Sequence, residues 1–251
     1  MVLAYDDAGS SGPPIVLVHG WCCHRGHMGA LLRRLSSPHR VLAIDLPGHG
    51  ETPRAEGPAT FETLSAALAS FLEEHDLLGA VLVGHSMGGV VSAMTATRAP
   101  DRVAAVVNLD GALPLPPAVR EAYRALFDDI RAKGFRAAVE PFLRRTFFLP
   151  WERGPIADGI LADMLAEPED LAVELLAQFP ILDAGPVLSA QRVPVLYVGS
   201  AHPRFDEAEA VRLLPELFVA RVAAAGHFVQ VFATDQVAAM IESFLRDVVD
   251  A

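Results

Sequence analysis

Ser86 is the residue whose setting in the sequence is best suited to chemistry. It lies at the centre of Gly84-His85-Ser86-Met87-Gly88, a G-x-S-x-G pattern. A short apolar run over residues 80–83 precedes the pattern, and a run compatible with a helix over 89–99 follows it. A serine between glycines at a strand-to-helix junction sits on a sharp, strained turn, with its hydroxyl under the N-terminal end of the helix. The pattern predicts a nucleophilic serine.

A serine hydroxyl is a weak nucleophile and needs a base within hydrogen-bond reach. His227 is the candidate for that base, because it follows the last expected strand, over 217–223, and would return to the same edge of the sheet as Ser86. The other histidines are given plainer roles: His85 is expected to point inward, His19 and His49 are interpreted as loop scaffold, and His24 and His27 as solvated or locally bonded side chains.

Short apolar strands alternate with helices along most of the chain. Strands are expected over residues 2–5, 15–18, 40–46, 80–83, 103–109, 193–199 and 217–223. Such alternation predicts an α/β protein with a mostly parallel central sheet and helices on both of its faces.

Residues 113–190 interrupt the alternation. Pro114, Pro116 and Pro117 begin this stretch, and the pattern after them indicates several helices and no strand. We expect a helical cap inserted over the carboxyl ends of the strands, where open α/β sheets bind ligands. The core domain would then comprise residues 1–112 and 191–251.

Composition excludes several classes of function. The chain has 251 residues, 52% of them hydrophobic, and a formal net charge of −11, which argues against a nucleic-acid partner. It has no apolar run of membrane-spanning length and no basic start followed by an apolar segment, so neither a membrane span nor a secretory signal is expected. Cys22 and Cys23 are adjacent, which disfavours a disulfide between them and suggests reduced thiols and a cytoplasmic location. No cluster has metal-ligand spacing, so neither a metal nor a cofactor is expected.

Several motifs together resemble the α/β-hydrolase fold family. His19-Gly20, the loop Asp45-Leu46-Pro47-Gly48-His49-Gly50, the serine pattern and Gly226-His227-Phe228 occur in the order typical of that family. The match covers the chain except for the cap. It implies an oxyanion hole formed by the backbone N–H groups of Trp21 and Met87. It says little about the substrate, because the fold hosts many reactions.

The sequence offers two candidates for the acid that would orient His227. In many members of the family the acid lies in a G-x-x-D turn, but here that turn reads Gly199-Ser200-Ala201-His202. Asp110, at the end of the expected strand 103–109, is the preferred alternative, since some family members carry their acid there. Asp206, a few residues beyond the usual turn, is the competitor.

The leading hypothesis is a serine hydrolase that cleaves a carboxylic ester or lactone through Ser86, His227 and Asp110. The expected cap is rich in aromatic residues, which favours a small apolar substrate. A cofactor-free haloperoxidase or perhydrolase, or a carbon–carbon bond hydrolase, would use the same three residues. A ligand-sensing protein of this fold is a further alternative, which the intact Ser86 and His227 pair disfavours.

Overall fold

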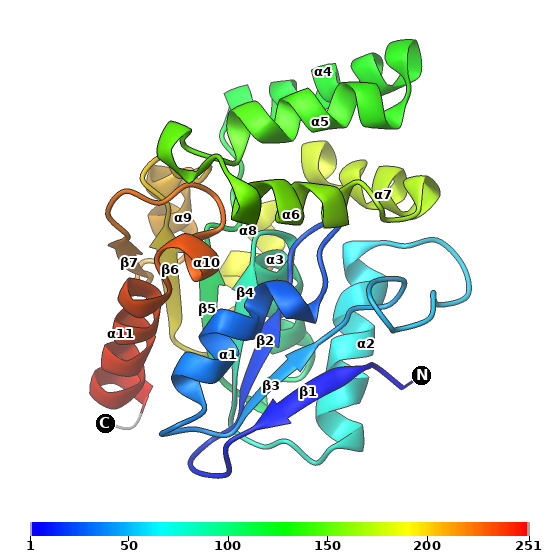
Figure 1. Ribbon diagram of the computed structural model, residues 1–251. Coiled ribbons are helices and arrows are strands. Elements are labelled where there is room, and N and C mark those ends of the chain that lie inside the picture. The colour runs from blue at the N-terminus through cyan, green and yellow to red at the C-terminus, as the bar shows by residue number, and fades with distance from the viewer. Residues whose placement is uncertain (1, 250–251) are drawn as a thin grey trace.

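The computed structural model describes residues 2–249 and contains one twisted central sheet (Figure 1). Within these residues the strand order is β1-β3-β2-β4-β5-β6-β7, and only β1 runs antiparallel to its neighbour. The strands are β1 (Tyr5–Ala8), β2 (Ile15–Val18), β3 (Val41–Ile44), β4 (Ala80–His85), β5 (Val103–Leu109), β6 (Val195–Gly199) and β7 (Phe218–Arg221). The predicted α/β class with a mostly parallel sheet is confirmed.

The first strand lies later in the chain than the predicted 2–5. Asp6 and Asp7 look like turn residues, yet their backbone pairs with β3 at the edge of the sheet. Their carboxylates point to solvent and bind the guanidinium groups of Arg25 and Arg40. An edge strand tolerates charged side chains on its open face, so composition alone misplaced this element.

Helices cover both faces of the sheet, and alternate residues of each strand supply the two sides of the core. Ile15 and Leu17 pack with one set of helices, α1 (Gly29–Leu35) and α11 (Thr234–Phe244). Val16 and Val18, one position along, pack on the opposite side. The helices there are α2 (Phe61–Glu74) and α3 (Met87–Arg98), with α9 (Glu207–Leu213) further along the sheet. Such period-two burial on both faces is expected of a parallel sheet.

A run of helices without a strand connects β5 to β6. It comprises α4 (Pro117–Lys133), α5 (Phe135–Thr146), α6 (Pro155–Met164), α7 (Glu169–Leu176) and α8 (Ala184–Ser189), with 3₁₀ turns at Pro150–Glu152 and Phe179–Ile181. In Figure 1, α4 to α7 lie above the carboxyl ends of the strands. The last of these helices, α8, packs beside α3 of the core. The expected boundaries of the cap, at residues 113 and 190, stay a prediction.

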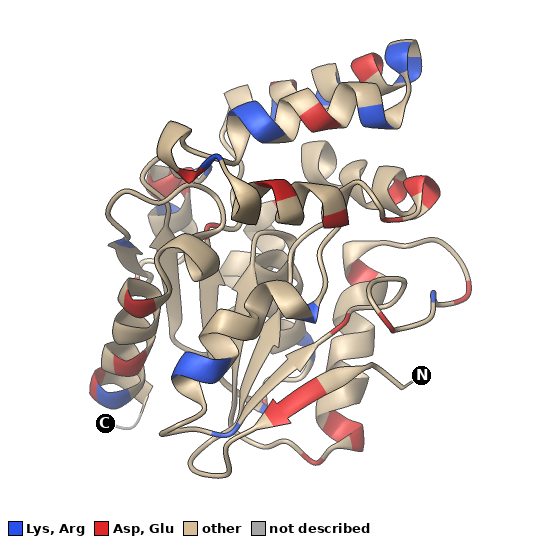
Figure 2. Cartoon of the chain, viewed as in Figure 1, with Lys and Arg blue, Asp and Glu red and all other residues tan. Residues whose placement is uncertain are grey.

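The remaining described elements are short. They are a 3₁₀ turn, η1 (Arg25–Met28), the four-residue helix α10 (Val229–Phe232) and a π-helical turn over Leu245–Val249. Acidic and basic residues are interspersed over the helices in the view of Figure 2. Among residues 2–249, no helix has both the length and the hydrophobicity needed to cross a membrane.

Candidate active site

The turn between β4 and α3 forces Ser86 into the left-handed region of backbone space, with φ of 53°. The turn closes so tightly that a Cβ on Gly84 would lie 2.1 Å from the carbonyl oxygen of Gly88. A Cβ on Gly88 would lie 2.3 Å from the carbonyl oxygen of Val18 in β2. Both glycines are therefore required by close backbone approach. The strain holds the Ser86 side chain at the carboxyl edge of the sheet.

His227 lies between β7 and α10 and links two side chains that are distant in the sequence. Its Nε2 lies 3.0 Å from Ser86 Oγ, and its Nδ1 lies 2.8 Å from Asp110 Oδ2. An ionised carboxylate only accepts hydrogen bonds, so Nδ1 carries the ring proton and Nε2 presents a lone pair to the serine hydroxyl. This is the tautomer that a general base needs.

Asp110 is held at the end of β5 by several donors besides His227. Its Oδ1 accepts hydrogen bonds from the backbone N–H of Ser200 at 2.8 Å and from the hydroxyl of Tyr197 at 3.3 Å. Burial raises the pKa of Asp110, but the bonds from His227 and Ser200 and the charge of Arg204 outweigh it. The net pKa lies below its ordinary value, and Asp110 is ionised.

The competing acid, Asp206, has a different role. It caps the N-terminus of α9, where its Oδ1 accepts the backbone N–H of Glu209 at 3.2 Å. Of the two candidates, the structure brings Asp110 to His227.

His227 is buried, and its surroundings keep it neutral. Burial, the largest influence, lowers the pKa of His227. Asp110 raises it through its bond and its charge, while the positive charge of Arg204 lowers it further, and the net pKa lies below the usual value. A neutral imidazole at neutral pH is ready to accept a proton.

The segment after α5 also touches His227, which the sequence did not predict. The ring of Phe147 lies 4.3 Å from the imidazole, and its carbonyl oxygen accepts the backbone N–H of His227 at 2.9 Å. The guanidinium of Arg204 lies 4.4 Å from the centre of the same phenyl ring. The aromatic richness of 113–190 was the only signal in the sequence, and it did not single out Phe147.

His85, within the serine pattern, contacts both the backbone and the ring of His227. Its Nε2 donates to the carbonyl oxygen of His227 at 2.9 Å, and the two rings lie 4.8 Å apart. Burial lowers the pKa of His85 well below its ordinary value, so it remains neutral.

The backbone at Gly20 and at the start of α3 lies close to Ser86, as the expected oxyanion hole requires. A Cβ on Gly20 would lie 3.2 Å from Ser86 Cβ, so the backbone that leads into Trp21 passes directly over the serine. Met87 begins α3, where helix N–H groups are free of intrahelical partners. The indole of Trp21 donates to the carbonyl oxygen of Ala172 in α7 at 2.8 Å, which ties the core to the cap helices. The roles of the Trp21 and Met87 N–H groups stay a prediction.

The adjacent cysteines follow Trp21 directly in the chain and lie in the interior. Cys22 and Cys23 are buried free thiols. Burial raises the pKa of both thiols, so at neutral pH both remain protonated.

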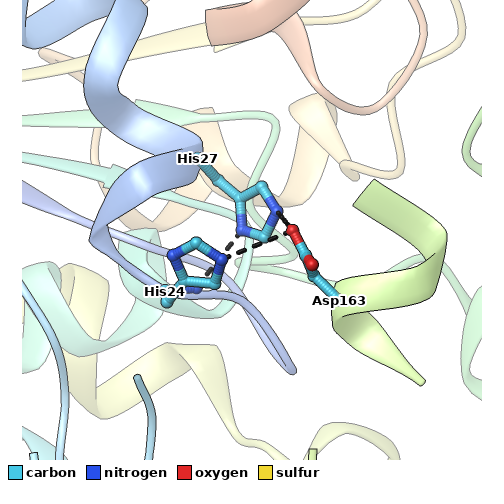
Figure 3. Close-up of side chains that lie close together, drawn as sticks. All are labelled: His24, His27 and Asp163. Atoms are coloured by element: carbon cyan, nitrogen blue, oxygen red, sulfur yellow. Dashed lines mark hydrogen bonds and ion pairs between the residues drawn. The ribbon is translucent and has the colours of Figure 1, made fainter. Parts of the chain in front are cut away.

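Two histidines interpreted as solvated form an unforeseen cluster with Asp163 of α6. Nε2 of His24 and Nε2 of His27 lie 3.4 and 3.2 Å from the same oxygen of Asp163 (Figure 3). Each Nδ1 accepts a backbone N–H, from Gly26 and from His24 respectively, so each neutral ring carries its proton on Nε2. Three such ligand-type atoms could hold a metal ion. A metal ligand, however, normally donates its second ring N–H, whereas these rings accept there. The cluster fits a hydrogen-bonded clasp between η1 and α6.

Comparison with known proteins places the chain in a family. The family model described as alpha/beta hydrolase fold matches residues 13–234. A dihydrolipoyllysine-residue acetyltransferase component of an acetoin cleaving system from Pseudomonas putida is 33% identical over 96% of this chain. The chain spans 66% of that relative's length.

Two further relatives are named as esterases. A pimeloyl-[acyl-carrier protein] methyl ester esterase from Neisseria meningitidis is 32% identical over 73% of each chain. A solved thermophilic esterase from Thermogutta terrifontis, with malate bound, is 26% identical over 98% of this chain and 94% of that chain, with a TM-score of 0.83. The extent of the family match, 13–234, shows that this chain belongs to the alpha/beta hydrolase fold family.

Proposed function

We propose that this protein is a serine hydrolase that cleaves carboxylic esters, lactones included. The observation that carries the proposal is the continuous chain of hydrogen bonds from Ser86 Oγ through His227 to Asp110, with distances of 3.0 and 2.8 Å. Nucleophile, base and orienting acid have the separations that the reaction needs.

The chemistry follows from the protonation states. His227 Nε2 takes the proton of Ser86 as Oγ attacks the carbonyl carbon, and Asp110 stabilises the imidazolium that forms. His227 then gives the proton to the oxygen of the leaving alcohol, and the acyl group remains on Ser86. Water, deprotonated by His227, attacks that ester, and His227 returns the proton to Ser86 Oγ as the acid is released. The N–H groups of Trp21 and Met87 would hold the negative oxygen of each tetrahedral intermediate.

The names of some relatives support ester chemistry. Two of them carry the word esterase in their names, one at 32% and one at 26% identity. Dehalogenases and epoxide hydrolases of this fold require a carboxylate nucleophile, and Ser86 occupies that position here.

The cap aromatics support the proposed apolar substrate pocket only in part. Tyr123 stacks on Phe179 at 5.2 Å, and Phe142 packs beside Phe147 at 6.4 Å, so most of these rings form the interior of the cap. Trp151 is 66% exposed, and its indole donates to the carbonyl oxygen of Ala224 in the loop after β7 at 3.0 Å. Phe147 is the aromatic residue of this group that contacts His227, and we assign it to the wall of the substrate site.

The proposal is tested by an activity screen with Ser86→Ala as the blank. Purified protein is offered 4-nitrophenyl esters of increasing acyl length, aryl acetates and lactones, with peracid formation and diketone cleavage measured in parallel. Turnover of esters that disappears in Ser86→Ala supports the proposal. Peracid formation or diketone cleavage without ester turnover would favour one of the alternative reactions instead.

A further inference from the structure

A small cavity lies beside His227, on the side of Asp110 and Phe147. Its volume is about 220 Å³, and it is enclosed by the end of α5, the segment after β6 and the loop of His227. Asp110 and His227 line it, together with Arg145, His202 and Arg204, whereas Ser86 does not. Arg145 and His202 are exposed, so the cavity opens to solvent beside them.

The cavity gathers positive groups in a chain with a net charge of −11. Many arginines here pair with a carboxylate, as Arg25 does with Asp45 and Arg144 with Asp158. Within residues 2–249, neither Arg145 nor Arg204 forms such a pair. Arg145 lies over the ring of Phe142 at 6.0 Å, and Arg204 donates one N–H to the carbonyl oxygen of Thr146.

The single carboxylate that lines the cavity does not neutralise these arginines. Asp110 directs one oxygen to His227 and the other to Ser200 and Tyr197. A guanidinium has five N–H donors, so Arg204 keeps donors beyond those that bind Thr146 and the hydroxyl of Tyr123. Two guanidinium groups with free donors at one cavity are the typical partners of a planar anion.

We propose that this cavity binds a small carboxylate through Arg204 and Arg145. The volume is below the roughly 300 Å³ at which pockets for drug-sized ligands begin, so the ligand or group is small. A single negative charge suits the site better than a phosphate dianion, because Asp110 already places one negative charge on the cavity wall. The carboxylate is either a free acid or the acid group of an ester substrate. The second possibility rests on the proposed function, and the first does not.

Binding is measured by calorimetry on Ser86→Ala protein, which removes turnover from the experiment. Propionate is the probe, and propionamide, its neutral counterpart, is the control ligand. We expect saturable binding of propionate and none of propionamide. Arg204→Gln should weaken binding by about tenfold or more, since a hydrogen bond to a charged group is lost.

Arg145→Gln is a second test that is safe for folding, because this side chain is exposed. It should also weaken propionate binding, whereas Arg33→Gln, an exposed arginine on α1, should leave it unchanged. Thermal melts of each variant confirm that the fold is intact. Propionate that does not saturate, or that binds equally well to Arg204→Gln and Arg145→Gln, overturns the proposal.

The source of the carboxylate is then separated on the active protein. The 4-nitrophenyl ester of propionic acid is compared with the 4-nitrophenyl monoester of succinic acid. A lower KM for the succinate monoester, lost in Arg204→Gln, assigns the site to the substrate's own acid group. Equal KM values, with propionate altering turnover of the neutral ester, assign it to a free acid. Failure of both esters to turn over would contradict the proposed hydrolase function and leave the calorimetric result standing.

Discussion

The carboxylate of Asp110 and the imidazole of His227 are 117 positions apart in the chain and meet at 2.8 Å in the buried interior. This contact fixes the ring proton on Nδ1 and so turns Nε2 towards Ser86. It depends on β5 and β7 delivering their following loops to the same edge of the sheet, with β6 between them. The proposed serine chemistry depends on that bond.

Replacement of the Asp110 carboxylate by an amide should leave the fold intact and remove most of the activity. Asp110→Asn changes which nitrogen of His227 carries the proton, and the corresponding change in serine proteases lowers kcat by about 10⁴-fold. Steady-state ester hydrolysis measures the loss. Asp206→Asn, which alters only the cap of α9, is the matched control and should keep near-normal kcat. If Asp206→Asn is the variant that fails, the assignment of the acid is wrong.

Activity should rise with pH through a midpoint below 6.5, the ordinary pKa of histidine. His227 must be neutral to accept a proton, and burial together with Arg204 lowers its pKa against the opposing effect of Asp110. His85, the other titratable ring against it, has its own pKa held well below the ordinary value by burial. A profile of kcat/KM from pH 4 to 8 gives the midpoint.

Arg204→Gln tests the smaller, electrostatic contribution to that shift, beside the larger one from burial. Removing the positive charge of Arg204 stabilises the protonated form of His227, so the pKa of His227 should rise. The midpoint of the kcat/KM profile should then move to higher pH. Arg33→Gln, on the surface of α1, should leave the midpoint of the profile unchanged. A midpoint that stays in place or moves to lower pH in Arg204→Gln would show that the charge of Arg204 does not lower the pKa of His227.

Gly88→Ala should destabilise the protein, because the new Cβ would lie 2.3 Å from the carbonyl oxygen of Val18 in β2 and 2.4 Å from that of His19. Overpacking of this kind costs about 1–3 kcal/mol, and here the neighbours are backbone atoms that yield little. Gly159→Ala, on the open surface of α6, is the control and should raise the free energy of unfolding by up to about 1 kcal/mol. Urea denaturation of both variants makes the comparison. Equal stabilities would contradict the tight packing of the serine turn.

Cys22 and Cys23 should resist a thiol reagent such as Ellman's reagent in the folded protein. Both are buried, and burial raises the pKa of each thiol, which leaves little reactive thiolate. Absorbance at neutral pH should show no fast reaction, followed by reaction of both thiols in urea. Fast labelling of the native protein would contradict their burial.

Features of the fold that follow from local sequence patterns could be predicted from the sequence. The glycines around Ser86 and the alternation of strands and helices led to the confirmed fold and, through the order of parallel strands, to the nearness of His227 and Asp110. Phe147 and Arg204 could not be foreseen, because their position against His227 depends on how α5 packs onto the loop after β6. The clasp of His24 and His27 with Asp163 was missed for the same reason, since Asp163 is more than 130 positions from both histidines.

The role of Ser86 as the nucleophile can be tested by mapping a covalent adduct. The protein is treated with a fluorophosphonate probe, digested and sequenced by mass spectrometry, with Ser86→Ala treated in parallel. We expect one adduct, on the peptide that carries Ser86, with loss of ester hydrolysis in proportion to labelling and no adduct on Ser86→Ala. An adduct on another residue with Ser86 unmodified, or full hydrolysis by Ser86→Ala, would show that Ser86 is not the nucleophile.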